Sequence, residues 1–186
     1  SKAWEQEASK RGLLNLRTAV DAIPYMRSKE NIELFERHGV YNSTEINCRA
    51  DIALDNYSKT MHIEAMVLLE MIKRDIMPAI SSYESTLCKT VAKKRAVSAD
   101  IDCDAEIATV EKLACFNSHL SKLSAELESA VKKSQDTDDL LERARFYCDE
   151  VRFIMDNIRN IADNAETITA RDYWPYPTYG DLLFKV

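Results

Sequence analysis

The sequence contains little glycine, little proline and no long apolar run. Gly occurs three times and Pro four times in 186 residues, well below their average usage of about 7% and 5%. Because these residues are the usual interruptions of regular structure, their scarcity favours long helices. No stretch of 18 apolar residues is present, so no membrane-spanning helix is expected. There is also no Gly-rich loop of the kind that cradles phosphate.

The charges exclude further classes of protein. The chain carries 31 acidic and 25 basic residues, for a net charge of -6, and the two signs are interleaved. Neither a nucleic acid nor an anionic membrane is therefore expected as a partner. The cysteines are odd in number, scattered and without a CxxC pair, which indicates buried thiols in a reducing, cytoplasmic setting; they are Cys48, Cys88, Cys103, Cys115 and Cys148.

The first residues, SKAWEQEASKRG, are charged and contain no signal-peptide core. Since the sequence also starts without Met, we expect an excised piece of a longer protein. Residues 2–11 are predicted to form a short helix that ends at Gly12, and Pro24 separates it from the next helix. In SKENIELFERHG, Ser28 is the predicted N-cap and Gly39 the stop signal of a second short helix.

A much longer helix is predicted from Ser43 onward. Its apolar residues recur in steps of three or four, the spacing of one helical face, at positions 46, 50, 53, 57, 61, 65, 68, 72, 76, 79/80, 83, 87 and 91. In HIEAMVLLEMI the apolar residues spread around most of the circumference, which predicts a helix buried on all sides at the centre of a bundle. Pro78 should kink this helix, because it lacks a backbone donor.

Two further helices, at 105–133 and 137–169, carry heptad patterns. The short turn SQDTD between them predicts antiparallel neighbours. The seam positions are Leu113, Phe116, Leu120, Leu123, Leu127 and Ala130 in the first helix, and Leu140, Ala144, Tyr147, Val151, Ile154, Ile158, Ile161, Ala165 and Ile168 in the second. No strand-like alternation is present.

The fold class predicted is therefore all-α. We expect an elongated helical bundle with a long kinked central helix, an antiparallel heptad-patterned helix pair and an extended C-terminal tail. Length favours one domain overall, made up of short helices in 1–42, the bundle in 43–170 and an aromatic, proline-containing tail in 171–186.

The stretch DIDCDAEIATVE, residues 100–111, resembles a calcium-binding EF-hand loop. Asp100, Asp102, Asp104 and Glu111 match four ligand positions, and Ile107 matches the apolar position. Ala105, however, occupies the position where the sharp turn of the loop requires Gly. We therefore favour the simpler interpretation, in which acidic residues gather at the positive N-terminus of a helix.

The three histidines, His38, His62 and His119, are far apart in the sequence. Cys115 and His119 are one turn apart and could supply two zinc ligands, but a structural site needs four and no second pair is visible. Ordinary packing or surface positions are the favoured interpretation. No catalytic, cofactor-binding or metal-binding residue is assigned, and no cofactor is expected in this chain.

The tail RDYWPYPTYGDLLFKV is unusual for a helical protein. Pro175 and Pro177 cannot continue a helix and favour extended geometry at Trp174 and Tyr176. Gly180 permits a turn, after which Leu182, Leu183 and Phe184 form a second apolar group. Aromatic residues of this size bury about 150–250 Å² each, so we expect the tail to be ordered and packed on helices or on a neighbouring surface. The rival interpretation, a proline-rich ligand for a partner domain, has only one P-x-P to support it.

Three stretches together resemble the C-terminal region of type III glutamine synthetases. They are WEQEASKRGLLNLRT (4–18), NYSKTMHIEAMVLLEMIKRDIMPAISSYE (56–84) and WPYPTYGDLLF (174–184). The resemblance extends over essentially the whole chain, and the last motif is the most specific, because helix patterning alone would not produce it.

The resemblance implies a bacterial, cytoplasmic parent enzyme that joins ammonia to glutamate with ATP and a divalent metal, magnesium. Its catalytic residues would precede residue 1, so none is carried over and this chain alone should be inactive. The implied partners are the catalytic domain and the neighbouring subunits of a large ring-built homo-oligomer, which this accessory region would brace. The alternative is a free-standing helical scaffold or interaction module.

Overall fold

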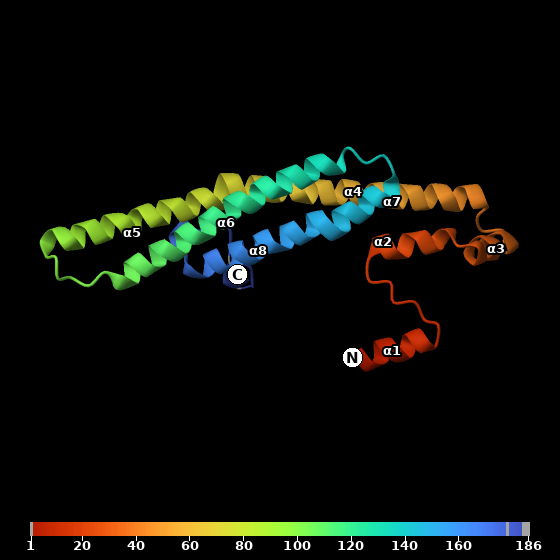
Figure 1. Ribbon diagram of the computed structural model, residues 1–186, viewed down its shortest axis with the longest axis horizontal. Helices are drawn as coiled ribbons and strands as arrows, with labels where there is room; N and C mark the ends of the chain where they lie inside the picture. Colours follow the sequence, from red (N-terminus) through yellow and green to blue (C-terminus); the bar gives the residue numbers. More distant parts are fainter. Residues whose placement is uncertain (1, 178, 184–186) are drawn as a thin grey trace. The chain divides into compact units, whose positions relative to one another are not determined.

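The computed structural model describes residues 2–177 and 179–183, and within these ranges every regular element is helical (Figure 1). The all-α prediction is confirmed. The helices are α1 (Lys2–Lys10), α2 (Ala19–Ala22), α3 (Lys29–Arg37), α4 (Ser43–Met71), α5 (Met77–Val97), α6 (Asp104–Ser134), α7 (Leu140–Phe146), α8 (Arg152–Ile168) and α9 (Tyr179–Leu183). Two 3₁₀ turns, Ile23–Arg27 and Arg171–Tyr173, and two π-turns, Ile72–Ile76 and Tyr147–Val151, complete the elements.

The chain divides into two compact units, which we describe separately. Unit 1 comprises Ser1–His62 and Lys133–Glu150, and unit 2 comprises Ile63–Lys132 and Val151–Val186. The expectation of one domain, with boundaries at 42/43 and 170/171, stays a prediction that cooperative unfolding would test.

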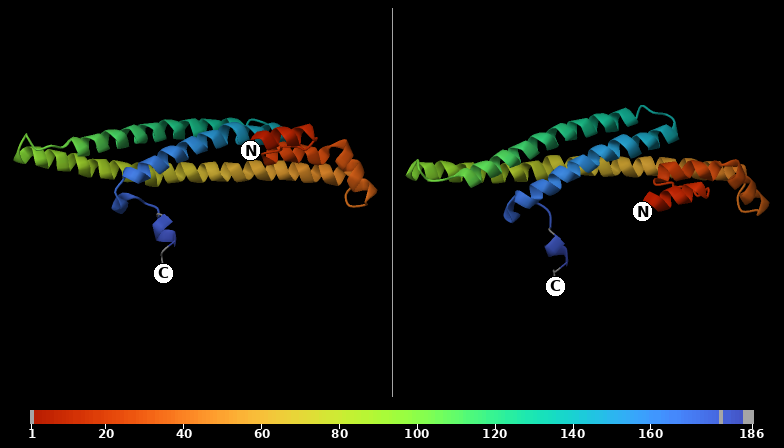
Figure 2. Two further views of the ribbon diagram at one scale, coloured as in Figure 1. Left: turned by 90° about the horizontal axis from the view of Figure 1, so that it is seen from below. Right: turned by 60° about the horizontal axis from the view of Figure 1, so that its bottom comes forward.

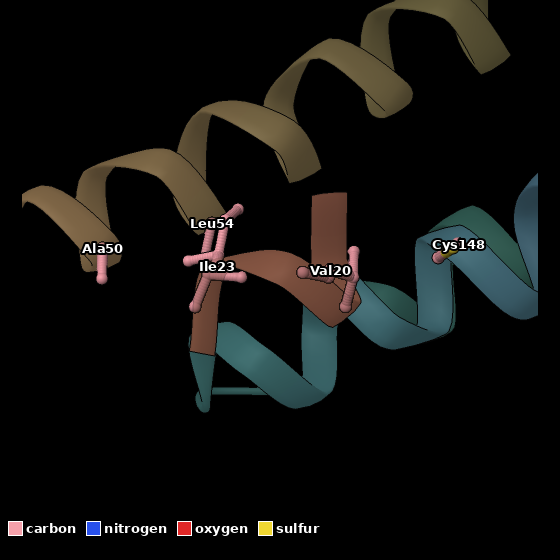
Figure 3. Packing of buried hydrophobic residues seen from close by; sticks show 6 residues of the cluster. Val20, Ile23, Ala50, Leu54 and Cys148 are labelled. Carbon is pink, nitrogen blue, oxygen red and sulfur yellow. The ribbon is translucent and has the colours of Figure 1, made fainter. Parts of the chain in front are cut away.

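The core of unit 1 forms where α2 and the following 3₁₀ turn pack against α4 and α7 (Figure 3). Its buried members are Val20, Ile23, Ala50, Leu54, Ala144 and Cys148. An ion pair between Arg27 and Asp51 lies in the same unit. This small apolar cluster holds α2 and the following 3₁₀ turn, which are too short to be stable helices on their own.

The predicted ends of the short helices are confirmed. The Ser28 hydroxyl accepts the N–H of Asn31 at 3.3 Å and so caps α3. Gly12 and Gly39 have positive φ values of 76° and 64°, the backbone geometry that ends a helix and favours glycine. Pro24 is the second residue of the 3₁₀ turn Ile23–Arg27, which directly follows α2.

The helical run from 43 to 97 changes to the π-turn Ile72–Ile76 just before Pro78, where the sequence predicted a kink. Here the Met77 N–H bonds to the carbonyl of Ile72, five residues earlier. A proline in a helix interior removes a donor and crowds the carbonyl four residues before it. The wider π-turn accommodates this defect without ending the helix.

The prediction that His62–Ile72 is buried on all sides is wrong. Ala65, Leu69 and Ile72 are buried, but Ile63 is 61% exposed and Val67 is 50% exposed. Met66 is also exposed. The apolar residues do surround the helix, but neighbouring elements of unit 2 cover only one side of it. A helix apolar all round is thus left with an uncovered apolar face.

The heptad seams of the last two long helices are confirmed. In unit 2, α6 and α8 run antiparallel (Figures 1 and 2), and the residues that line their seam are buried: Leu113, Leu120, Leu127, Ile154, Ile158 and Ala165. The second helix differs from the prediction in two respects. It begins at Leu140, where Asp139 accepts the N–H of Glu142 as the N-cap, and it contains the π-turn Tyr147–Val151.

All five cysteines are free thiols, but only Cys103 and Cys148 are buried. The prediction of buried thiols therefore holds for two of them, one in each unit. The tail is also less extended than predicted, since it contains the 3₁₀ turn Arg171–Tyr173 and helix α9. Gly180 lies inside α9 and has no positive φ, so the turn predicted at this residue is wrong.

Candidate functional site

No group of three or more metal-ligating side chains occurs in the part of the chain that the structure describes. None of the described helices is both long enough and apolar enough to cross a membrane.

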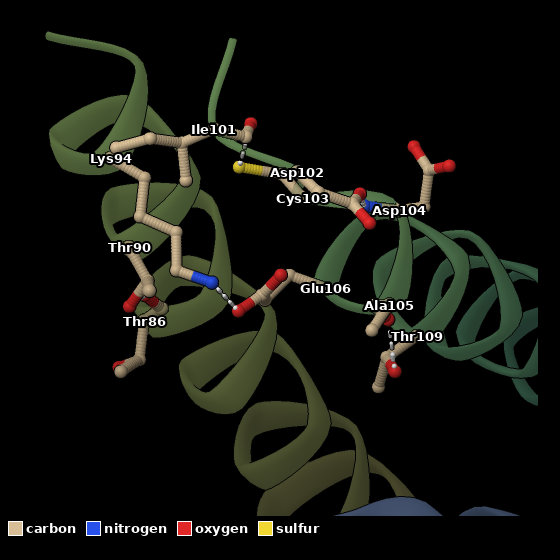
Figure 4. A network of polar contacts seen from close by, with 10 residues as sticks. All are labelled: Thr86, Thr90, Lys94, Ile101, Asp102, Cys103, Asp104, Ala105, Glu106 and Thr109. Atoms are coloured by element: carbon tan, nitrogen blue, oxygen red, sulfur yellow. Dashed lines mark hydrogen bonds and ion pairs between the residues drawn. The ribbon is translucent and has the colours of Figure 1, made fainter. Parts of the chain in front are cut away.

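The acidic stretch 100–111 joins α5 to α6 and does not gather its carboxylates around one point (Figure 4). The Asp102 carboxylate accepts the N–H of Asp104, the first residue of α6, at 2.9 Å. Glu111 lies on α6 itself. The positions agree with the simpler interpretation of acidic residues at a helix N-terminus, and the absence of calcium binding stays a prediction.

A pair that the sequence did not reveal connects the two helices beside this stretch. Lys94, near the end of α5, is hydrogen-bonded and ion-paired to Glu106 in the first turn of α6 (Figure 4). The hydrogen bond lowers the pKa of Glu106 and raises the pKa of Lys94. The contact has a structural role, because it joins the two ends of the α5–α6 connection.

The histidines lie at separate places. His38 follows α3 as its C-cap. In unit 1, the Nδ1 of His62 lies 3.0 Å from the Tyr147 hydroxyl, and Ser134 lies 2.8 Å from the same hydroxyl. Tyr147 is only 3% exposed, so these contacts satisfy a phenol that would otherwise be buried without a partner. We interpret this histidine as a packing residue.

The Cys115–His119 pair is the one cysteine–histidine contact that the sequence had singled out. Both side chains are on α6 and exposed, and the Sγ of Cys115 lies 3.9 Å from the Nδ1 of His119. The surface position agrees with the sequence interpretation, while the short separation shows that the two side chains point toward each other.

The tail packs on α5 through two contacts of Tyr173, one between aromatic rings and one between hydroxyl groups. The ring of Tyr173 lies 5.2 Å from that of Tyr83, with a tilt of 45° between them. The Tyr173 hydroxyl is 2.8 Å from that of Thr86. The prediction that the tail is ordered and packed on the helices of its own chain is confirmed for this segment.

A second contact follows after Pro175. The Tyr176 hydroxyl donates to the Asp75 carboxylate at 2.7 Å, within the π-turn before α5. Burial, together with this hydrogen bond, raises the pKa of Tyr176 to about 12. Trp174, between the two tyrosines, is half-buried. The tail therefore contacts both the π-turn Ile72–Ile76 and the following helix α5.

The second apolar group of the tail is not packed. Leu182 and Leu183 are exposed, and Phe184 lies outside the described residues. Unit 2 exposes further large apolar side chains, at Ile63, Met66 and Val67 of α4 and at Phe153 of α8. A hollow of about 350 Å³ is lined by residues of α5 and α6, namely Cys88, Val91, Ala92, Arg95, Ile107, Val110 and Glu111.

Unit 1 also exposes apolar side chains near its N-terminal segments. They include Trp4, Leu13, Leu14, Leu34 and Val40, and Ile52 of α4 is exposed as well. Single exposed apolar residues are normal on soluble proteins, but both units carry several of them. In the part of the chain that the structure describes, both units thus combine helical elements with exposed apolar side chains.

Comparison with known proteins identifies the family. The sequence model of a family described as the glutamine synthetase C-terminal domain matches residues 1–95. The chain belongs to this family. The resemblance found in the sequence is therefore confirmed.

Similar proteins align with nearly all of this chain. A glutamine synthetase of Butyrivibrio fibrisolvens is 37% identical over 183 residues, which are 98% of this chain and 26% of that protein. A glutamine synthetase of Bacteroides fragilis is 26% identical over 188 residues, and the match covers 99% of this chain and 26% of that protein. A type-3 glutamine synthetase of Dictyostelium discoideum is 25% identical over 197 residues, and the match covers 97% of this chain and 25% of that protein. The chain spans about a quarter of the length of these relatives.

Proposed function

We propose that this chain is the non-catalytic C-terminal accessory region of a type III glutamine synthetase and that it braces the catalytic domain or the contacts between subunits. The whole enzyme would make glutamine from glutamate, ammonia and ATP. The observation that carries the proposal is the alignment of nearly the whole chain with about a quarter of each relative. The remaining three quarters of such a protein would hold the catalytic machinery.

The catalytic chemistry would depend on residues outside this chain. Activation of a carboxylate by ATP and attack by ammonia need carboxylates that bind metal and basic groups that bind phosphate. In the described residues, several acidic side chains pair with Lys or Arg, and no group of three or more side chains that could hold a metal ion occurs. We assign the binding of ATP and magnesium to the proposed catalytic domain because the family relationship implies them for the whole enzyme.

The bracing role is supported by the apolar residues that the two units leave uncovered. Ile63, Met66 and Val67 lie on one exposed side of α4 in unit 2. Contiguous apolar side chains on a surface mark contact sites for other protein segments. We propose that the rest of the longer polypeptide, or a neighbouring subunit of a ring-built homo-oligomer, covers this face. A cytoplasmic location and a bacterial source are part of the same proposal, although one relative comes from Dictyostelium.

The first test is to read the gene upstream of Ser1. We expect the reading frame to continue into a catalytic domain, and a stop codon directly upstream would favour the free-standing scaffold instead. The isolated chain should fold but form no glutamine from glutamate, ammonia and ATP.

The second test compares two variants of the full-length protein. Ile63→Ser with Val67→Ser alters the exposed face of α4, and a matched pair of substitutions at Lys59 and Thr60 alters exposed polar positions of the same helix. We expect the first variant, but not the second, to reduce the mass in solution or the ligase activity. Equal behaviour of both variants would show that the apolar face does not contact the catalytic domain or another subunit.

A further inference from the structure

The end of α5, the start of α6 and their connection form a two-helix segment, which we call the hairpin tip (residues 87–112). It lies within unit 2. In the same unit, α8 ends at Ile168, and the turn that follows it packs on α5 at Tyr83. From there α5 and α6 extend past the end of α8 (Figures 1 and 2). The hairpin tip therefore continues two helices of a layer that has a third helix further along.

The apolar residues of the hairpin tip are only partly covered. Leu113 and Leu120, further along α6, are fully buried, whereas Ile107 and Val110 in the tip are half-buried. On α5, Val91 is half-buried as well. These three tip residues line the hollow of about 350 Å³ described above. Since two helices alone bury only part of their apolar stripes, the hollow has room for side chains from a further helical element.

The charges of the hairpin tip balance one another and differ between the two helices. The segment contains five basic and five acidic residues, so it is neutral, while the whole chain carries a net charge of -6. The five acidic residues lie between Asp100 and Glu111, on the connection and on α6. Four of the five basic residues lie on α5, and the basic residues are Lys89, Lys93, Lys94, Arg95 and Lys112.

One charge of each sign lines the hollow, Arg95 from α5 and Glu111 from α6. Lys94 and Glu106 pair with each other across the connection. Neither Arg95 nor Glu111 forms an ion pair with another described residue, and both are exposed. The hollow thus combines an apolar lining with an unpaired cation and an unpaired anion at its rim.

We propose that two copies of this chain associate through their hairpin tips about a two-fold axis, with α5 of each copy against α6 of the other. In a two-fold interface every contact occurs twice with the roles of the copies exchanged. Arg95 of one copy therefore meets Glu111 of the other in both directions. The half-buried residues of the two hollows come together between these pairs, and the four helices form a small bundle.

The distribution of charge favours a second copy as the occupant of the hollow. A partner of one charge sign would attract one helix of the tip and repel the other, which costs affinity and specificity. A second copy turned by the two-fold axis places a basic helix on an acidic one at both places. The contact is separate from the exposed face of α4, so it stands or falls independently of the proposed bracing role.

The association is expected to be weak. The part of α5 in the tip is roughly 16 Å long at about 1.5 Å per residue. An interface of this length should bury less than the roughly 1,200–2,000 Å² of stable complexes. We therefore expect a dimer that dissociates on dilution.

The test is sedimentation equilibrium of the 186-residue chain. The concentration series should run from about 1 μM to about 1 mM, which includes the dissociation constants of weak complexes. We expect the mass to rise from that of a monomer toward that of a dimer. Arg95→Glu and Glu111→Arg each place like charges opposite one another twice, so each should raise Kd by at least about tenfold. The double variant carrying both substitutions restores opposite charges and should recover the Kd of the parent.

Lys122→Glu and Glu126→Arg are the matched controls. They make the same changes of charge at exposed positions of α6 that do not line the hollow, so Kd should stay as in the parent. Ile63→Ser with Val67→Ser should also leave Kd unchanged, which separates this result from the test of the proposed function. Far-UV circular dichroism should be the same for all variants.

Three results would each overturn the proposal. A chain that stays monomeric up to the highest concentration would leave the hollow to another segment, such as the rest of the longer polypeptide. Association that neither Arg95→Glu nor Glu111→Arg weakens would place the contact elsewhere on the chain. Failure of the double variant to associate, with its helical content intact, would show that the two residues do not face each other across a two-fold axis.

Discussion

Replacing Leu69 with Ala tests which side of α4 is packed in unit 2. Leu69 is 4% exposed, so the substitution removes three buried carbons. At about 0.8 kcal/mol per methylene the transfer cost is about 2.4 kcal/mol. A residual cavity raises the total, and buried Leu→Ala substitutions cost roughly 2–5 kcal/mol. We expect a loss in that range.

Val67→Ala is the matched control two residues away. It removes two carbons from a side chain that is 50% exposed, which is a transfer cost of about 0.8 kcal/mol. Alanine is also the better helix former by about 0.5 kcal/mol. The net change in the free energy of unfolding should therefore be less than about 0.5 kcal/mol, the usual range for exposed positions. Leu68, which is half-buried, should lie between the two.

The assay is urea unfolding of the isolated chain followed by far-UV circular dichroism. The midpoint should shift for Leu69→Ala while the slope stays constant, because the surface exposed on unfolding is nearly unchanged. If Leu69→Ala unfolds like the parent while Val67→Ala costs more than about 2 kcal/mol, the packed and open sides of α4 have been assigned the wrong way round.

Tyr176→Phe should lower the free energy of unfolding by about 0.5–1.5 kcal/mol, the usual net value of a hydrogen bond, through loss of the bond to Asp75. Because folding raises the pKa of Tyr176 to about 12, its stabilisation is complete below about pH 10 and is lost as the pH rises toward 12. Alkaline unfolding curves should therefore fall more steeply for the parent than for Tyr176→Phe, and parallel curves would contradict the contact. Deleting residues 173–186 should lower Tm, since the stacking of Tyr173 is also lost, and an unchanged Tm would mean that the docked tail contributes nothing to stability. Calorimetric titration with calcium should show no binding, whereas micromolar affinity that Asp100→Ala abolishes would revive the EF-hand interpretation.

Periodicity and caps predicted most of the fold, because both act locally. The heptad steps of Leu113, Leu120 and Leu127 need only the 3.6-residue repeat to identify a buried face. Ser28 and Gly39 act on the backbone within one turn of their own positions. Such signals depend little on the rest of the chain, so they can be read directly from the sequence.

Features that depend on distant residues could not be predicted in the same way. The bond between Tyr176 and Asp75 joins residues 101 positions apart, and no local pattern marks either residue for the other. The exposure of Ile63 and Val67 depends on which neighbours cover α4, which hydrophobicity alone does not determine. Pro78 predicted a local distortion of the helix, and the structure has the first π-turn, Ile72–Ile76, just before it. The second, at Tyr147–Val151, contains no proline and has no such signal.

The cysteines also supply the chain with probes for local opening that need no substitution. Cys148 is buried in unit 1 and Cys103 in unit 2, while the other three thiols are exposed and should react with a labelling reagent at once. A buried thiol reacts only when its surroundings open, so its labelling rate measures the stability of that region. Mass spectrometry of the two labelled peptides therefore follows each unit separately. Equal opening free energies would mean that the units unfold together, and unequal ones would identify which unit opens first.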